Sequence, residues 1–385
     1  MNAVAGGAAL TPLQADLLRA AFRADEAAIT AWRRWRDAVD WDAHLDHDSF
    51  RLLPRVYRPL CRQGAGDPLL PRLKGVARQA WYANQHRLRQ FQPTLQALAA
   101  AGVEPLLLPP TALLLDDATA VLGRQAPLSC AVRAAAVETA IRCLRRVGWH
   151  TAIRLPRWSL SGYVLGANRL AWRDGAGQTL ELQWQRDPGD RCGRFPDEVW
   201  TRAGAARLVN EPVLALDAAD AVHDLCRQPV AGKAFARVVD LLLYVDAAKA
   251  PPDWRRVLAR TAQAPVDAAW PGMFDDLREL VPALVPPAVG TAWSAPAPQP
   301  APAPAAATGT LHERIRAHWS VYRQAWGRDY SVAKAVRHLP GYLLARWQLS
   351  APGALPLRLW RGLRCEWRDA RRSRQTASSG GPAGR

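Results

Sequence analysis

Acidic and histidine side chains gather near the N-terminus, where His44, Asp46, His47 and Asp48 lie within five residues. Imidazole and carboxylate groups at such spacing are the ligands of many metal sites. Neighbouring residues of a helix project in different directions, so these four side chains would not converge on one ion. The pattern therefore predicts the solvated start of a helix rather than a metal site.

A second acidic pair, Asp116 and Asp117, has the residue types needed for general acid and base catalysis. Adjacent carboxylates more often mark a polar helix end or turn, which is the prediction here. The sequence contains no Walker P-loop, G-x-G-x-x-G, G-x-S-x-G or H-E-x-x-H motif. Common nucleotide-binding, hydrolase and zinc-protease signatures are thereby excluded.

The cysteines indicate no metal or disulfide chemistry, because none stands in a C-x-x-C pair or at zinc-like spacing with histidine. They are predicted to be reduced, partly buried thiols: Cys61, Cys130, Cys143, Cys192, Cys226 and Cys365. The opening MNAVAGGAALTPLQADLL lacks a basic segment before its apolar stretch, which argues against a signal peptide. No uncharged hydrophobic run of spanning length occurs outside the Pro-rich segment, so a cytoplasmic protein is expected.

The elements that must position such residues change type along the chain. Residues 1–102 carry apolar side chains at helical spacing and are predicted to be a helical region that ends at Gly102. Within 103–210, short apolar runs predict strands, with a helix over 134–147 that Gly148 closes. These runs are 103–108, 128–132, 151–155, 162–165, 169–172 and 179–184.

Helical periodicity returns over 211–284, where Asp217 and Asp253 stand at positions suited to helix N-caps. Together these patterns predict an α/β (α+β) fold with a mixed sheet between N- and C-terminal helical regions. We expect the strands at 103–108, 128–132 and 179–184 to be neighbours in that sheet. The helix over 134–147 should pack its apolar face on it.

Charge is distributed unevenly along the chain. Its 51 Lys and Arg residues exceed 34 acidic residues, for a net charge of +17, while 49% of residues are apolar. This composition excludes collagen-like and disulfide-scaffold proteins. Residues 285–309 are an uncharged Ala/Pro linker, and residues 310–385 carry 15 basic and 4 acidic residues. A basic helical tail, with a disordered end, is predicted after the linker.

Apolar side chains of this tail fall into two helical stripes among arginines. They are Leu311, Ile315, Trp319, Tyr322 and Trp326, then Trp360, Leu363 and Trp367. Such helices can dock on the protein's own body, lie on an anionic membrane surface, or bind nucleic acid. Binding of 310–374 to anionic lipid is a prediction, and location would then be cytoplasmic with membrane association. Nucleic acid is the least favoured partner, because no helix-turn-helix signature stands out.

Five segments occur in an order that carries a family resemblance. They are FRLLPRVYRPL at 50–60, LAAAGVEPLLLPPTALLL at 98–115, PLSCAVRAAAVETAIRCLRRVGW at 127–149, LELQW at 180–184 and ARVVDLLLYV at 236–245. In order and spacing the chain resembles the uncharacterised bacterial nucleotidyltransferases, a branch of the polymerase-beta-like superfamily. The resemblance implies a nucleotidyltransferase-like mixed sheet. It also implies, in an active member, Mg²⁺ and a nucleoside triphosphate.

The chain departs from the family where the family's chemistry resides. The Lys-Gly pair that follows the family's first strand is Pro109 and Pro110 here, and its two metal-binding aspartates are Pro127 and Ser129. Only Glu181 matches a family carboxylate. Two-metal catalysis needs several hard carboxylate oxygens, which proline cannot supply, and proline also lacks the N–H that would hold a phosphate.

We therefore predict a nucleotidyltransferase-family protein whose catalytic site is degraded and which has a binding or regulatory role, with a nucleotide or protein as partner. One alternative is an active Mg²⁺-dependent transferase with Glu181 as a catalytic residue. Another is a scaffold at the membrane surface. As a strand residue, Glu181 is more simply explained by solvent exposure or by pairing with an arginine.

Overall fold

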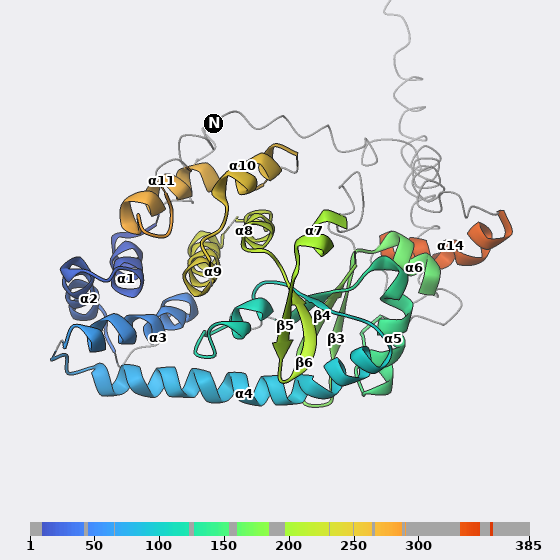
Figure 1. Ribbon diagram of the computed structural model, residues 1–385, viewed down its shortest axis with the longest axis horizontal. Helices are drawn as coiled ribbons and strands as arrows, with labels where there is room; N and C mark the ends of the chain where they lie inside the picture. Colours follow the sequence, from blue (N-terminus) through green and yellow to red (C-terminus); the bar gives the residue numbers. More distant parts are fainter. Residues whose placement is uncertain are drawn as a thin grey trace, which may run out of the picture.

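The chain folds into helices around a six-stranded sheet in this computed structural model (Figure 1). The structure describes residues 10–41, 45–64, 66–122, 127–153, 160–184, 197–230, 232–248, 250–263, 266–286, 289, 332–346 and 355–356.

The N-terminal region is helical, as predicted. It comprises α1 (Pro12–Phe22), α2 (Glu26–Ala38), α3 (His47–Arg62) and the long α4 (Leu70–Ala100). A capping box starts α1, where the Thr11 hydroxyl accepts a hydrogen bond from the backbone N–H of Gln14. Gly102 follows α4 with a φ of +68°, the left-handed conformation that glycine adopts most easily, so it ends the helix as expected.

The sheet is mixed and has the strand order β3-β4-β2-β1-β6-β5. Its strands are β1 (Leu106–Leu107), β2 (Leu128–Ala131), β3 (Arg169–Arg173), β4 (Thr179–Gln183), β5 (Gly204–Leu208) and β6 (Glu211–Ala215). β2 runs parallel to β4 and antiparallel to β1, which is parallel to β6. The three strands predicted to be neighbours are therefore adjacent in one sheet, as expected.

Each face of the sheet packs on a different core. Leu128, Cys130 and Leu180 share one buried cluster with Phe91 of α4 and Ile141 of α5 (Val137–Arg146). On the opposite face, the buried cluster is made by Leu106, Leu108, Ala131, Val199, Trp200, Leu216 and Ala221. These last residues include members of α7 (Asp197–Arg202) and α8 (Ala218–Cys226), so helices cover this face over β1 and β2, while Arg169, Ala171 and Arg173 of β3 are exposed.

The later helices pack beside the N-terminal ones. Figure 1 shows α9 (Ala234–Ala247), α10 (Trp254–Gln263) and α11 (Trp270–Leu280) at the same end of the molecule as α1 to α3. α3 is joined to α9 by ion pairs of Arg51 with Asp240 and of Arg55 with Asp246. The predicted N-caps are confirmed, since Asp217 accepts from the N–H of Ala219 and Asp253 from that of Arg256.

One predicted strand is wrong, another is absent over the described part of its range 151–155, and one hairpin was not predicted. Residues 162–165 lie in the helix α6 (Leu160–Gly166), and residues 151–153 contain no strand, although His150 forms an isolated bridge with Arg173. The hairpin of β5 and β6 extends the sheet to Ala215, beyond the boundary predicted at 210. Val209 and Asn210 form its two-residue turn with φ values of +47° and +69°.

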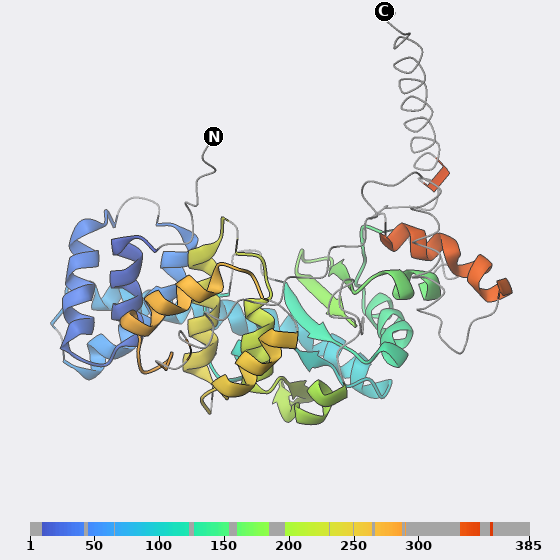
Figure 2. The ribbon, with the colours of Figure 1, turned by 90° about the horizontal axis from the view of Figure 1, so that it is seen from above.

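Only part of the predicted tail is described. The helix α14 (Val332–Arg346) lies against α6 at the far end of the molecule from α1 (Figure 2). Of the linker predicted at 285–309, Val285 and Val289 are buried in the main hydrophobic core, so the folded body extends into its predicted start. Residues 290–309 and both predicted tryptophan stripes fall outside the described residues. The proposed contact of 310–374 with anionic lipid therefore stays a prediction. None of the described helices is long and apolar enough to cross a membrane.

Candidate functional site

The residues that the resemblance aligns with the family's metal and phosphate positions lie at one edge of the sheet. β1 ends and β2 and β4 begin at this edge, because β2 is antiparallel to β1 and parallel to β4. Ser129 is the direct register partner of Glu181, and Pro127 and Glu181 line one cleft. Pro109 and Pro110 follow β1 and lead into the short helix η1 (Thr111–Leu115).

Backbone hydrogen bonds hold this edge together. The Thr111 hydroxyl accepts from the backbone N–H of Ser129 at 2.6 Å, and the Ser129 carbonyl accepts from the N–H of Leu108 at 3.0 Å. The N–H of Ser129 is thus used within the fold. Neither Pro109 nor Pro110 has an N–H to offer at the turn where the resemblance places the family's Lys-Gly pair.

Glu181 is engaged by its neighbours on the sheet. Its Oε1 atom accepts a hydrogen bond of 2.6 Å from Nε2 of Gln183, and its carboxylate lies 3.5 Å from Nη1 of Arg169. The Arg169 side chain is 64% exposed and that of Glu181 19%, so this ion pair is only partly shielded from water. Glu181 thus has the arginine partner that the simpler interpretation of the sequence anticipated.

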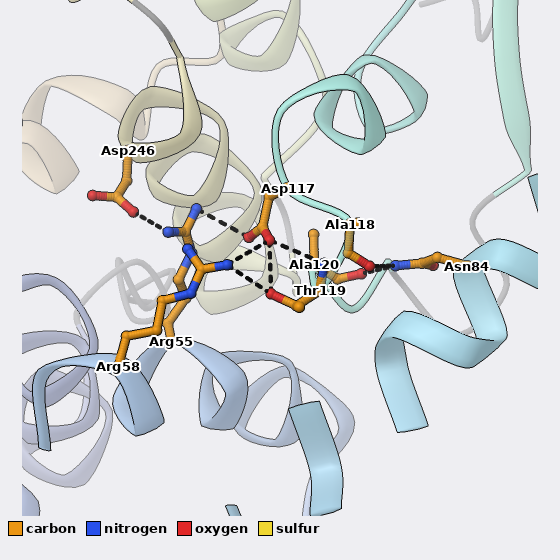
Figure 3. Close-up of polar contacts among 8 residues, drawn as sticks. All are labelled: Arg55, Arg58, Asn84, Asp117, Ala118, Thr119, Ala120 and Asp246. Atoms are coloured by element: carbon orange, nitrogen blue, oxygen red, sulfur yellow. Dashed lines mark hydrogen bonds and ion pairs between the residues drawn. The ribbon is translucent and has the colours of Figure 1, made fainter. Parts of the chain in front are cut away.

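Asp117 precedes Pro127 and Ser129 in the chain and could in principle supply a missing carboxylate. It is instead paired with arginines of α3 (Figure 3). It is buried, and its carboxylate forms ion pairs with Arg55 at 3.1 Å and Arg58 at 3.0 Å. The same carboxylate accepts from the N–H and hydroxyl of Thr119, which closes the turn after η1. Asn84 of α4 fixes that turn further by donating to two of its carbonyls.

The charge state of Asp117 follows from these contacts. Burial alone would raise the pKa of its carboxyl, but Arg55, the Thr119 hydroxyl and Arg58 together hold that pKa below the ordinary value. Asp117 is therefore an ionised anchor between α3 and the turn before β2. Asp116 lines a separate cleft with Asp217 and Arg256, which form an ion pair. The two adjacent carboxylates therefore do not act as a pair: Asp117 is buried against arginines of α3 and Asp116 lines a different cleft, as expected for a polar turn.

The acidic and histidine group near the N-terminus forms a helix start, as predicted. Asp46 is the N-cap of α3 and accepts from the backbone N–H of Ser49 at 2.9 Å. Asp48 lies 3.4 Å from Arg51 within the same helix, and His44 falls outside the described residues. Across the described part of the chain, no three His, Cys, Asp or Glu residues are grouped so that they could hold a metal ion.

Four of the six cysteines are described and all four are free thiols, as predicted. Cys61 is exposed, whereas Cys130, Cys143 and Cys226 are buried. Burial raises the pKa of the Cys130 thiol to about 12, so this β2 residue is an unreactive core side chain. Cys192 and Cys365 lie outside the described residues.

A cleft of about 1120 Å³ lies beside Glu181, between α4 and the β3–β4 hairpin. Residues with basic side chains line it from three parts of the chain: His86 and Arg87, His150, and Arg173. The sequence analysis missed this group. The only signal was a helical face of α4 formed by Ala83, His86, Arg87 and Gln90, and no sequence pattern paired that face with the hairpin.

Comparison with known protein families supports the resemblance inferred from the sequence. The model of a family described as uncharacterised nucleotidyltransferases matches residues 37–271, which is more than half of the chain. No curated protein matches the chain. The matched range includes α3, α4, the whole sheet and helices α8 to α10, and every site position described above lies within it. The chain belongs to this family of uncharacterised nucleotidyltransferases.

Proposed function

We propose that this chain is a nucleotidyltransferase-family protein that binds a ligand at the cleft beside Glu181 without transferring a nucleotidyl group. The observation that carries the proposal is the pairing of Ser129 with Glu181 at the sheet edge, with Pro127 beside them. Where the family has two metal-binding aspartates, this edge has a proline and a neutral hydroxyl. Glu181, the one carboxylate at this edge in the described part of the chain, is occupied by Gln183 and Arg169.

The electrostatic requirement of the reaction supports this view. Two divalent ions would have to be held within reach of one triphosphate, which demands several carboxylate oxygens at fixed positions. Glu181 alone offers two oxygens, and one accepts a 2.6 Å hydrogen bond. A nucleoside triphosphate would bring Mg²⁺ with it, yet neither ion would find the protein ligands that orient the attacking hydroxyl.

We expect no Mg²⁺-dependent transfer from labelled ATP, GTP, CTP or UTP to protein, antibiotic or sugar acceptors above background. The measurement is incorporation of label, with Glu181→Ala as the matched variant. Product formed by the unaltered protein and lost in Glu181→Ala would contradict the proposal and assign Glu181 a catalytic role.

Restoring the family's carboxylates should restore metal binding. The variant Pro127→Asp/Ser129→Asp places two carboxylates beside Glu181, and Mn²⁺ should then stabilise it by about 2.7 kcal/mol at 100 times the dissociation constant. The readout is the shift of thermal unfolding with added Mn²⁺. The control Pro127→Asn/Ser129→Asn has similar shape without charge and should not respond. A Mn²⁺ response in the unaltered protein would contradict the degraded-site proposal.

A further inference from the structure

The cleft beside Glu181 has an excess of positive charge that its own acidic residues do not neutralise. Glu181 is paired with Arg169, and among the described residues it is the one acidic residue that lines the cleft. Asp174, in the hairpin turn next to the cleft, accepts the backbone N–H groups of Ala176 at 3.0 Å and Gln178 at 2.8 Å. Both carboxylates are thus engaged within the fold.

Arg87 is the central feature of this cleft. Its side chain is half-buried, and its backbone carbonyl accepts from Nε2 of Gln178 at 3.1 Å, which fixes α4 against the hairpin. Burial lowers the pKa of its guanidinium from the ordinary value, and no charged neighbour contributes to that shift. A half-buried guanidinium without a nearby carboxylate among the described residues has lost hydration that an anion would restore.

Arg173 lines the same cleft from the end of β3, and it is exposed. Its backbone forms two hydrogen bonds with His150, at 2.9 and 2.8 Å, which fix the strand end beside this histidine. The two arginines thus come from elements about 85 residues apart, held in place by the contacts of α4 with the hairpin. Two arginines that line one cleft offer planar guanidinium donors that are well suited to phosphate oxygens.

We propose that this cleft binds a small phosphate-bearing anion through Arg87 and Arg173, without a metal ion. This inference rests on the proposed function, because guanidinium groups here supply the positive charge that metal ions supply in a transferase. The cleft volume of about 1120 Å³ is large enough to admit an organic phosphate.

The test is calorimetric titration of the full chain with inorganic pyrophosphate in the presence of EDTA. The unaltered protein should bind, and Arg87→Ala and Arg173→Ala should each weaken binding by about 10-fold or more. Arg89→Ala is the matched control, because it removes the same charge from α4. Arg89 is exposed and does not line the cleft. It should change binding by less than about 2-fold.

Thermal unfolding of each variant separates lost binding from lost folding, and the exposed Arg173 keeps the test informative if Arg87→Ala is unstable. Binding that needs Mg²⁺, or that falls equally in Arg89→Ala, overturns the inference. Absence of pyrophosphate binding also overturns it, while the proposed lack of transfer is judged separately by the labelled-nucleotide assay. Transfer activity would overturn the proposed function whatever pyrophosphate does.

Discussion

Replacement of Asp117 by alanine is expected to lower the free energy of unfolding by about 3–5 kcal/mol. The side chain of Asp117 is 2% exposed and that of Arg55 8%, so removing the carboxylate leaves a guanidinium buried with one fewer counter-charge. The change also frees the N–H and hydroxyl of Thr119, which Asp117 now accepts. Chemical denaturation monitored by circular dichroism measures the effect.

A surface ion pair provides the control for this experiment. Asp37 is 65% exposed and lies 2.8 Å from Arg36, so Asp37→Ala removes the same chemical group from a solvated pair. Its effect should be below about 1 kcal/mol. Equal effects of the two substitutions would mean that Asp117 does not anchor α3 to the turn before β2.

The contribution of Asp117 should also depend on pH. Its folded-state pKa is held below the ordinary value of 3.8, so its stabilising effect is fully present above that value. The effect is lost as the pH falls through the lower, folded-state pKa. The stability difference between the unaltered protein and Asp117→Asn should therefore be constant from neutral pH down to about 5 and shrink below about 3.8. A difference that grows on acidification would contradict the assigned ion pairs.

Short, mostly apolar runs made the centre of the sheet predictable. Leu128 to Ala131 are all buried, and such a run bounded by turn residues is typical of a strand covered on both faces. The family resemblance then placed Ser129 and Glu181 at corresponding positions. Their direct pairing could not be derived from the residues themselves, because register depends on how two distant strands align.

The hairpin of β5 and β6 lacked the usual signals of a strand pair. Alanine and glycine fill much of β5, Pro212 lies in β6, and the turn uses Val209 and Asn210 instead of Asn-Gly. Segment 162–165 failed for a different reason. Its Tyr-Val-Leu run has strand propensity, but the segment forms the helix α6, which packs against α14.

That contact depends on two glycines of α6. Gly162 and Gly166 are four residues apart and therefore lie on one helical face. A Cβ atom at Gly162 would overlap the carbonyl oxygen of His338, and one at Gly166 would lie 2.8 Å from that of Tyr342. Both positions are too close for a side-chain carbon, and the two oxygens belong to the backbone of α14, so they cannot rotate away. The side chain of Tyr342 in α14 is almost fully buried.

Substitution of Gly162 by alanine should therefore displace α14 from the body of the protein. A 15-residue helix that contains Pro340 has little stability by itself, so α14 should unfold once it no longer packs against α6. Trypsin should then cleave after the exposed Arg337 about 10-fold faster or more, since cleavage of an opened segment follows the population of the open form. Mass spectrometry of the early fragments identifies this site.

The matched control is Gly75→Ala, because Gly75 also lies in a helix and a Cβ there meets no atom within 4 Å. Equal cleavage rates in the two variants, with both proteins folded by thermal unfolding, would show that α14 does not pack against α6 in solution.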